Sequence, residues 1–194
     1  MHRKTIFSGI EARDIVISLM VLAIVFSYPE FLSRPESLVV SILILGVAFM
    51  GHELSHKFSA RRFGYWAEYR MWAAGLGLAL VMAIATSGNF IFAAPGAVMF
   101  GASLLSVPKK KDVGKIGLAG PAFNIISAAI LIAAFLAYPA RLLLTAVAIN
   151  SWLAVFNLIP VPPLDGQKVF SWSKVIWAAA ITIAGAELAF VFLG

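Results

Sequence analysis

The chain has 194 residues, of which 61% are hydrophobic and 12% are charged. Soluble domains average about 25% charged residues, so this composition indicates an integral membrane protein. The 15 Lys and Arg outnumber the nine Asp and Glu, but they are scattered between apolar runs, which excludes a nucleic-acid-binding protein. Because the chain has no cysteine, any metal site must use His, Asp or Glu.

Several apolar segments are each close to the roughly 20 residues that a membrane-spanning helix requires. In chain order they are residues 12–31, 38–60, 72–94, 116–138, 142–160 and 174–193. Residues 88–106 are apolar too, but three glycines and Pro95 argue against a regular helix there. We therefore predict an all-α polytopic membrane protein with about six transmembrane helices and a re-entrant or extended segment near residues 88–106. Such a segment should line a cavity, since irregular backbone inside a membrane must be hydrogen-bonded by protein or water.

The positive charges predict the sidedness of the chain, because cytoplasmic loops carry most Lys and Arg. If residues 72–107 enter the membrane and return to the same side, 13 of the 15 Lys and Arg share one side. If this region crosses once, the same residues divide eight to seven. The sequence therefore predicts a cytoplasmic N-terminus, with 72–107 as either a two-pass hairpin or one helix and a re-entrant segment. Residues 1–194 are expected to form a single membrane domain.

The sequence GHELSHKFSARR, near the end of the second apolar segment, places His52, Glu53 and His56 in the pattern H-E-x-x-H. Two histidines four residues apart lie on one face of a helix, so both can bind one Zn2+ while the glutamate faces the reacting water. In the alternative interpretation the histidines bond to neighbours and Glu53 pairs with Lys57. Clustered ionisable groups at membrane depth are costly unless they serve a site, which favours the metal site.

A catalytic zinc site usually has three protein ligands and an open fourth position, and the third ligand has two candidates. Asp165 lies in NLIPVPPLDGQKV, where the prolines and a glycine predict an extended segment. Glu187 lies in the last apolar segment, where it can instead snorkel or pair. In the charge-derived topology the second and fifth apolar helices both end at the cytoplasmic side, which brings Asp165 to the depth of His56.

With these motifs the chain resembles the site-2 protease family of intramembrane zinc metalloproteases, in a compact form without PDZ or regulatory domains. The resemblance rests on the H-E-x-x-H motif, on GPAFN at 120–124 and on NLIPVPPLDG at 157–166. It implies a catalytic core over about 38–62 and 116–170. It further implies that one zinc ion is bound by His52, His56 and Asp165, with Glu53 as the catalytic base.

The resemblance also implies that Asn157 contacts the substrate backbone or the oxyanion, and it gives Asn124 a related or merely helix-packing role. For Asn157 the alternative is capping or bridging the backbone freed by Pro160. The expected reaction is hydrolysis of peptide bonds within or near transmembrane segments of membrane-protein substrates, with the zinc site toward the cytoplasmic side of the lipid bilayer. A membrane helix must unwind before it is cut, and an extended segment around 94–100 can pair with it by strand addition.

Two other functional classes stay open from the sequence. One is a membrane transporter that binds metal in transit, and the other is a catalytically inactive protein that binds membrane clients. The oligomeric state is left open as well.

Overall fold

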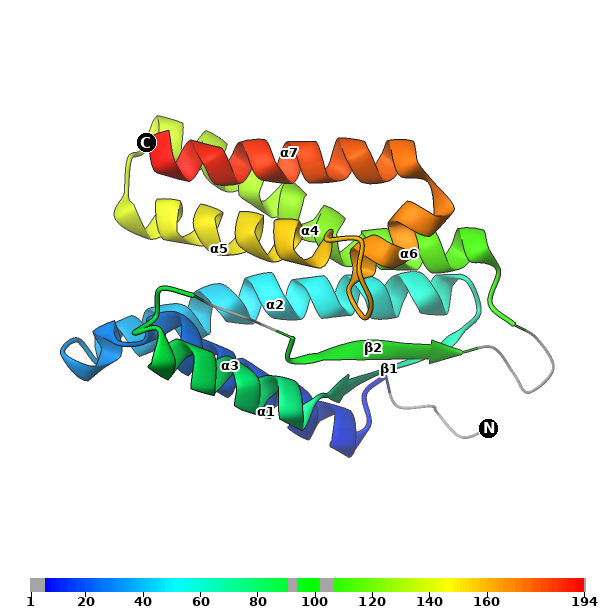
Figure 1. Ribbon diagram of the computed structural model, residues 1–194, viewed down its shortest axis with the longest axis horizontal. Coiled ribbons are helices and arrows are strands. Elements are labelled where there is room, and N and C mark those ends of the chain that lie inside the picture. The colour runs from blue at the N-terminus through cyan, green and yellow to red at the C-terminus, as the bar shows by residue number, and fades with distance from the viewer. Residues whose placement is uncertain (1–5, 91–93, 102–106, 194) are drawn as a thin grey trace. The chain divides into compact units, whose positions relative to one another are not determined.

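The computed structural model describes residues 6–90, 94–101 and 107–193. The protein is mainly helical, which supports the expected all-α membrane class, and its elements are shown in Figure 1. In chain order they are α1 (Gly9–Ser27), the 3-10 helix η1 (Glu30–Leu32), α2 (Glu36–Arg62), β1 (Trp66–Met71), α3 (Ala73–Ala85), β2 (Gly96–Gly101), α4 (Lys110–Ala137), α5 (Arg141–Asn157), α6 (Asp165–Trp172) and α7 (Lys174–Leu193). Strands β1 and β2 form a two-stranded sheet, for which the sequence predicted an extended segment at β2 but no strand at β1.

Three of the described helices, α2, α4 and α7, are long and apolar enough to cross a membrane. The expected six crossings are therefore not confirmed. Helices α3 and α5 are apolar but have 13 and 17 residues, fewer than the roughly 20 that a crossing requires. Helix α1 has 19 residues, but Glu11, Arg13 and Asp14 make its N-terminal end polar.

The helix expected over 72–94 is wrong in its second half, because α3 ends at Ala85. Ser87 and Gly88 follow with φ angles of 51° and 79°, a conformation that glycine adopts readily and that stops a helix. The extended segment expected near 88–106 is confirmed for 96–101, where β2 lies. Residues 91–93 and 102–106 lie outside the described residues.

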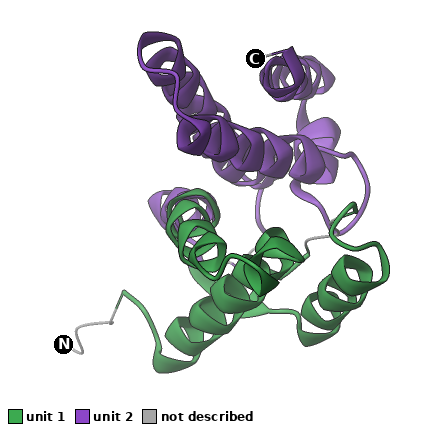
Figure 2. Cartoon of the chain, turned by 90° about the vertical axis from the view of Figure 1, so that its left-hand side faces the viewer, with its two compact units in different colours: residues 1–50, 67–100 green, residues 51–66, 101–194 purple. Residues whose placement is uncertain are grey.

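The chain divides into two compact units, which Figure 2 colours separately. Unit 1 comprises residues 1–50 and 67–100, and unit 2 comprises residues 51–66 and 101–194. Within unit 1, α1 packs against α3. The buried core of this contact consists of Val25, Ala79 and Ala83.

Within unit 2, α4 packs against α5, α6 and α7, and α5 packs against α7. The α5–α7 contact is centred on a buried cluster made up of Ala154, Leu158, Ala180 and Ala184. Small side chains let helix backbones approach closely, which is how helices associate where lipid removes the usual hydrophobic driving force. These packed helices carry the polar side chains of unit 2 that are described below.

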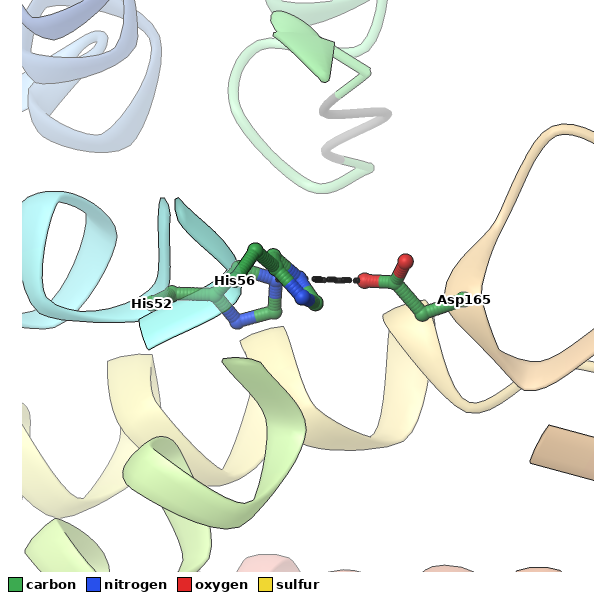
Figure 3. Close-up of side chains that lie close together, drawn as sticks. All are labelled: His52, His56 and Asp165. Carbon is green, nitrogen blue, oxygen red and sulfur yellow. Dashed lines mark hydrogen bonds and ion pairs between the residues drawn. The ribbon is translucent and has the colours of Figure 1, made fainter. Parts of the chain in front are cut away.

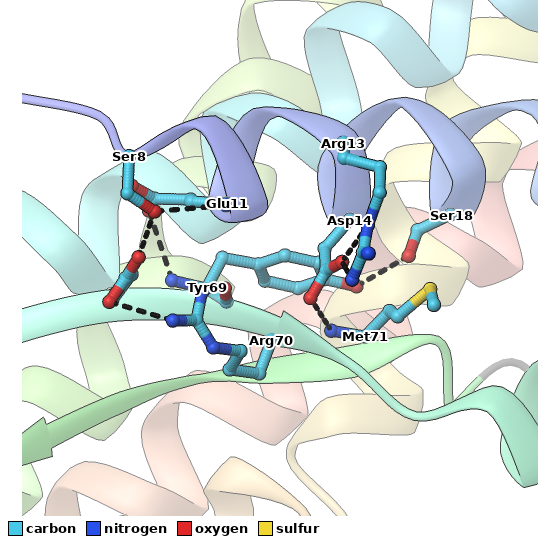
Figure 4. A network of polar contacts seen from close by, with 9 residues as sticks. Ser8, Glu11, Arg13, Asp14, Ser18, Tyr69, Arg70 and Met71 are labelled. Carbon is cyan, nitrogen blue, oxygen red and sulfur yellow. Dashed lines mark hydrogen bonds and ion pairs between the residues drawn. The ribbon is translucent and has the colours of Figure 1, made fainter.

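Acidic side chains of α1 bind strand β1 within unit 1 (Figure 4). Glu11 Oε1 accepts a hydrogen bond from the backbone N–H of Tyr69 at 3.0 Å, and Asp14 Oδ2 accepts one from the N–H of Met71 at 3.3 Å. The Tyr69 hydroxyl also donates to Ser18 at 2.9 Å. Alternate N–H groups of a strand point to the same edge, so α1 covers one edge of β1 while β2 pairs with the other.

Replacing Glu11 by Leu is expected to lower the stability of the fold, because the N–H of Tyr69 then loses its acceptor. A buried donor left unpaired costs about 1–3 kcal/mol. Glu11→Gln retains an acceptor oxygen and should cost less, and Glu30→Gln, in an exposed ion pair with Arg34, should have little effect. The midpoint of thermal unfolding in detergent measures all three. Equal losses for Glu11→Leu and Glu11→Gln would contradict the role of this oxygen.

Candidate metal centre

The H-E-x-x-H motif lies on the part of α2 that belongs to unit 2. His52 and His56 are one helical turn apart, and their Nε2 atoms are separated by 3.0 Å. Both side chains are buried, with exposed fractions of 3% and 5%. The helix thus brings the two imidazoles together as their spacing predicts.

Asp165 lies beside the two histidines and points toward them (Figure 3). Its Oδ2 atom is 2.8 Å from Nε2 of His56 and 3.4 Å from Nε2 of His52. The extended conformation expected at Asp165 is wrong, because Asp165 is the first residue of α6. The prolines occupy the preceding turn instead, and a carboxylate in the first turn of a helix is favourable.

Glycines on one face of α4 let the neighbouring elements approach closely. A Cβ atom at Gly114 would collide with Trp172, and one at Gly117 would lie 2.9 Å from Cβ of Lys168. At Gly120 it would collide with Nε2 of both histidines. The three glycines are spaced three residues apart, which places them on neighbouring turns of one helix face. The spacing is visible in the sequence, where residues 114–120 read GKIGLAG.

The three side chains fit one zinc ion. Zinc binds His nitrogen and carboxylate oxygen at about 2.0–2.2 Å with tetrahedral geometry, which places two ligand atoms roughly 3.3 Å apart. The observed separations are 2.8, 3.0 and 3.4 Å. Two imidazoles and one carboxylate are also a donor set found in catalytic zinc sites. His52, His56 and Asp165 therefore form a group that can hold a metal ion within the described part of the chain.

Each ligand is also held through an atom that faces away from the centre. Nδ1 of His56 donates to the backbone carbonyl of Ile116 at 2.7 Å, and Nδ1 of His52 lies 2.5 Å from Oδ1 of Asn124. Oδ1 of Asp165 accepts from Nζ of Lys168 at 2.8 Å. Such outer contacts orient metal ligands and fix the histidine tautomers.

The surroundings of Asp165 favour its ionised form. Burial by itself raises the pKa of this carboxyl group, but its contacts with His56, Lys168 and His52 bring the pKa well below its ordinary value. A carboxylate must be deprotonated to bind a metal. Lys168 lies three residues after Asp165, so helical spacing would have indicated the pair had α6 been predicted.

Glu53 is buried next to these ligands in the sequence, with an exposed fraction of 8%. Its carboxylate interacts electrostatically with His52 and Asp165. Its Oε2 atom has no hydrogen-bond partner among the residues that the structure describes. A buried carboxylate oxygen without a partner costs free energy, and a bond to a proton or to water would remove that cost.

The remaining predicted residues lie in different surroundings. Asn124 is fully buried, and besides His52 it contacts Asn150, a residue outside the predicted motifs. Nδ2 of Asn157 donates to the carbonyl of Leu153, one turn back in α5, and its contact with substrate stays a prediction. Glu187 lies on α7 and is not part of the metal-binding group.

Comparison with known proteins gives one informative similarity. The chain is 37% identical over 177 residues to a protein of Methanocaldococcus jannaschii named "Putative zinc metalloprotease", and the aligned region covers 89% of each chain. No protein-family model matches the chain. No solved structure matches it either.

We expect Asp165→Ala and His56→Ala to lose the zinc that the wild-type protein retains on purification. Removing a ligand should lower zinc affinity by more than about a hundredfold, since even outer contacts are worth about ten- to a hundredfold. Metal content per chain, measured by mass spectrometry after dialysis against a weak chelator, checks this. Glu187→Gln is the matched control, another buried carboxylate, and should retain zinc. Retention of zinc by Asp165→Ala together with its loss in Glu187→Gln would reverse the assignment of the third ligand.

Gly120→Ala is expected to weaken zinc binding at least about tenfold, because the added methyl group displaces the imidazoles from their ligand positions. Gly46→Ala provides the control, since a Cβ at Gly46, also on α2, meets no atom within 4 Å. Competition with a chromophoric chelator measures both affinities. Wild-type affinity in Gly120→Ala would show that the close contact between α4 and the histidines is not required.

Proposed function

Because the chain belongs to the zinc metalloprotease family named for this Methanocaldococcus jannaschii protein, we propose that it hydrolyses peptide bonds within or near transmembrane segments of membrane proteins, as site-2 proteases do. One observation carries the proposal: the group formed by His52, His56 and Asp165 lies on a chain whose motif helix, α2, is long and apolar enough to cross a membrane. Ionisable residues on a membrane-spanning helix are costly and usually mark a functional site, which favours chemistry within the membrane.

The proposed reaction divides the chemistry between the metal and the chain. A bound zinc ion would act as a Lewis acid that polarises the scissile carbonyl and makes the attacking water more acidic. His52 and His56 would bind it through Nε2, and Asp165 through Oδ2. These assignments agree with the outer contacts, which occupy the opposite atom of each ligand.

Glu53 is the proposed acid–base residue. Its carboxylate accepts a proton from the attacking water as the water oxygen bonds to the carbonyl carbon. The same proton then passes to the leaving nitrogen as the C–N bond breaks, which yields a carboxylate and an amine. The oxygen without a partner, Oε2, supports this role because no other group of the described chain competes for it.

Asn157 is proposed to bind the oxyanion or the substrate backbone. Nδ2 carries two hydrogens, and the bond to Leu153 uses one of them. The other can donate to the developing oxyanion, an interaction worth about 3 kcal/mol in a preorganised site. Asn124, whose oxygen faces His52, is better suited to orient that ligand than to contact substrate.

We further propose that the N-terminus and the zinc site face the cytoplasm and that α1, α3 and α5 lie within the bilayer, as α2, α4 and α7 do. The substrate is a membrane-spanning helix, which must unwind before its carbonyls are accessible. The unwound segment is proposed to add as a strand to β2, since α1 already covers the far edge of β1.

Glu53→Gln is expected to lower the rate of peptide cleavage about 10²- to 10⁴-fold while zinc stays bound, because the amide cannot accept the proton. The assay uses the purified protein in liposomes with single-span substrates whose transmembrane helix contains an Asn-Pro pair near its cytoplasmic end. Cleavage products are quantified by mass spectrometry. Glu187→Gln, the same change at another buried glutamate, should cleave at the wild-type rate.

Three results would contradict the proposal. Cleavage by Glu53→Gln at the wild-type rate removes the assigned base. Zinc flux into the liposomes without cleavage identifies a transporter. Tight substrate binding by zinc-loaded wild-type protein without any cleavage identifies an inactive client binder.

A further inference from the structure

We propose that Asn150, acting through Asn124, determines which nitrogen of His52 faces the zinc ion. This inference rests on the proposed function and deepens it. It gives a positioning role to a residue of α5 that belongs to none of the motifs.

Three buried side chains form a continuous chain of hydrogen bonds within unit 2. Nδ1 of His52 lies 2.5 Å from Oδ1 of Asn124, and Nδ2 of Asn124 donates to Oδ1 of Asn150 at 3.1 Å. Nδ2 of Asn150 then donates to the backbone carbonyl of Ala146 at 2.9 Å. The exposed fractions are 3% for His52, 0% for Asn124 and 3% for Asn150, so water does not compete for these bonds.

The direction of this chain follows from its last member. The carbonyl of Ala146 can only accept, so the group of Asn150 that faces it must be the NH2 group. The oxygen of Asn150 therefore faces Asn124, where it requires a donor. This requirement turns the NH2 group of Asn124 toward Asn150 and its oxygen toward His52. The oxygen in turn requires a proton on Nδ1 of His52, which leaves the lone pair of Nε2 for the metal.

The two histidines differ in how much support their orientation needs. Nδ1 of His56 faces a backbone carbonyl, which can only accept a hydrogen bond. Nδ1 of His52 meets a side-chain amide, whose two ends have nearly the same shape and exchange donor for acceptor when the amide flips. A flipped Asn124 would present N–H to His52 and favour a proton on Nε2, which prevents metal binding through that atom. Because the flip would also place two oxygens together, Asn150 opposes it.

Zinc affinity provides the first test, measured by competition with a chromophoric chelator on the purified full chain. Asn150→Leu retains the size of the side chain but removes its acceptor, and it should weaken zinc binding about ten- to a hundredfold. Asn150→Asp should retain most of the affinity. A protonated carboxyl group at this position offers both an acceptor and a donor, as the amide does.

Two further variants separate positioning from general damage. Ser151→Ala changes the next residue of α5, which is fully buried and lies outside the chain of bonds, and it should bind zinc like the wild type. Asn124→Leu combined with Asn150→Leu should bind zinc no more weakly than Asn124→Leu alone, since Asn150 acts through Asn124. Additive losses in the double variant would overturn the inference.

A direct measurement on the wild type does not depend on how the variants fold. The chain has three histidines, so 15N-histidine spectra of the metal-free protein contain few signals, and His2→Ala together with His56→Ala assigns them. At a pH where His52 is neutral, we expect its proton on Nδ1. A proton on Nε2 of His52, or wild-type zinc affinity in Asn150→Leu, would overturn the inference and leave the protease proposal intact. Failure of the protease proposal appears separately, as absent zinc binding or absent cleavage by the wild-type protein.

Discussion

The metal centre depends on close approach of the histidine-bearing turn of α2 and the start of α6 to α4, and glycine makes this approach possible. At Gly120 a single methyl group would occupy space next to both imidazoles, and at Gly117 it would press on Lys168. Close approach also lets the backbone of α4 serve the centre, because the carbonyl of Ile116 becomes the acceptor for His56. The three candidate ligands thus lie on α2 and α6, and α4 holds the histidines through one backbone carbonyl and the side chain of Asn124.

Many polar side chains of this chain are buried, and a buried polar group is costly unless it is hydrogen-bonded. In unit 1, Glu11 and Asp14 are buried on α1 and accept from the strand N–H groups of β1. In unit 2 each metal ligand has an outer partner. Among the described residues, the buried side-chain atoms without a partner are Ser37 Oγ, Glu53 Oε2, Ser151 Oγ and Glu187 Oε2. Of these, the Glu53 atom belongs to a residue between two metal ligands in the sequence. Its unmet hydrogen-bonding capacity is what the proposed proton transfer would use.

The sequence predicted the parts of this structure that follow from helical periodicity. The pairing of His52 with His56 requires one turn of helix, and Asp165 followed from the direction in which two apolar helices run. The extended segment predicted from the prolines was taken to include Asp165. A proline pattern does not indicate where the next helix begins. Strand β1 and the Asn124–Asn150 contact depend on which side chains meet after packing, and a single sequence carries no signal for that. The six crossings are not confirmed, and one reason is that residues 72–94 were counted as one apolar segment although α3 ends at Ala85 and the polar residues Thr86, Ser87 and Asn89 follow it.

The position of Asp165 is determined by the end of α5 rather than by α2. The carbonyl of Leu158 accepts from the indole N–H of Trp177 at 2.7 Å, and a Cβ atom at Gly166 would collide with the same carbonyl. The turn between α5 and α6 is therefore held against α7 on one side, and it requires glycine directly after the aspartate. Asp165 and the histidines thus lie on different elements, α6 and α2, and meet through their side chains. A metal that binds all three links these elements, so its binding free energy also stabilises the fold of unit 2.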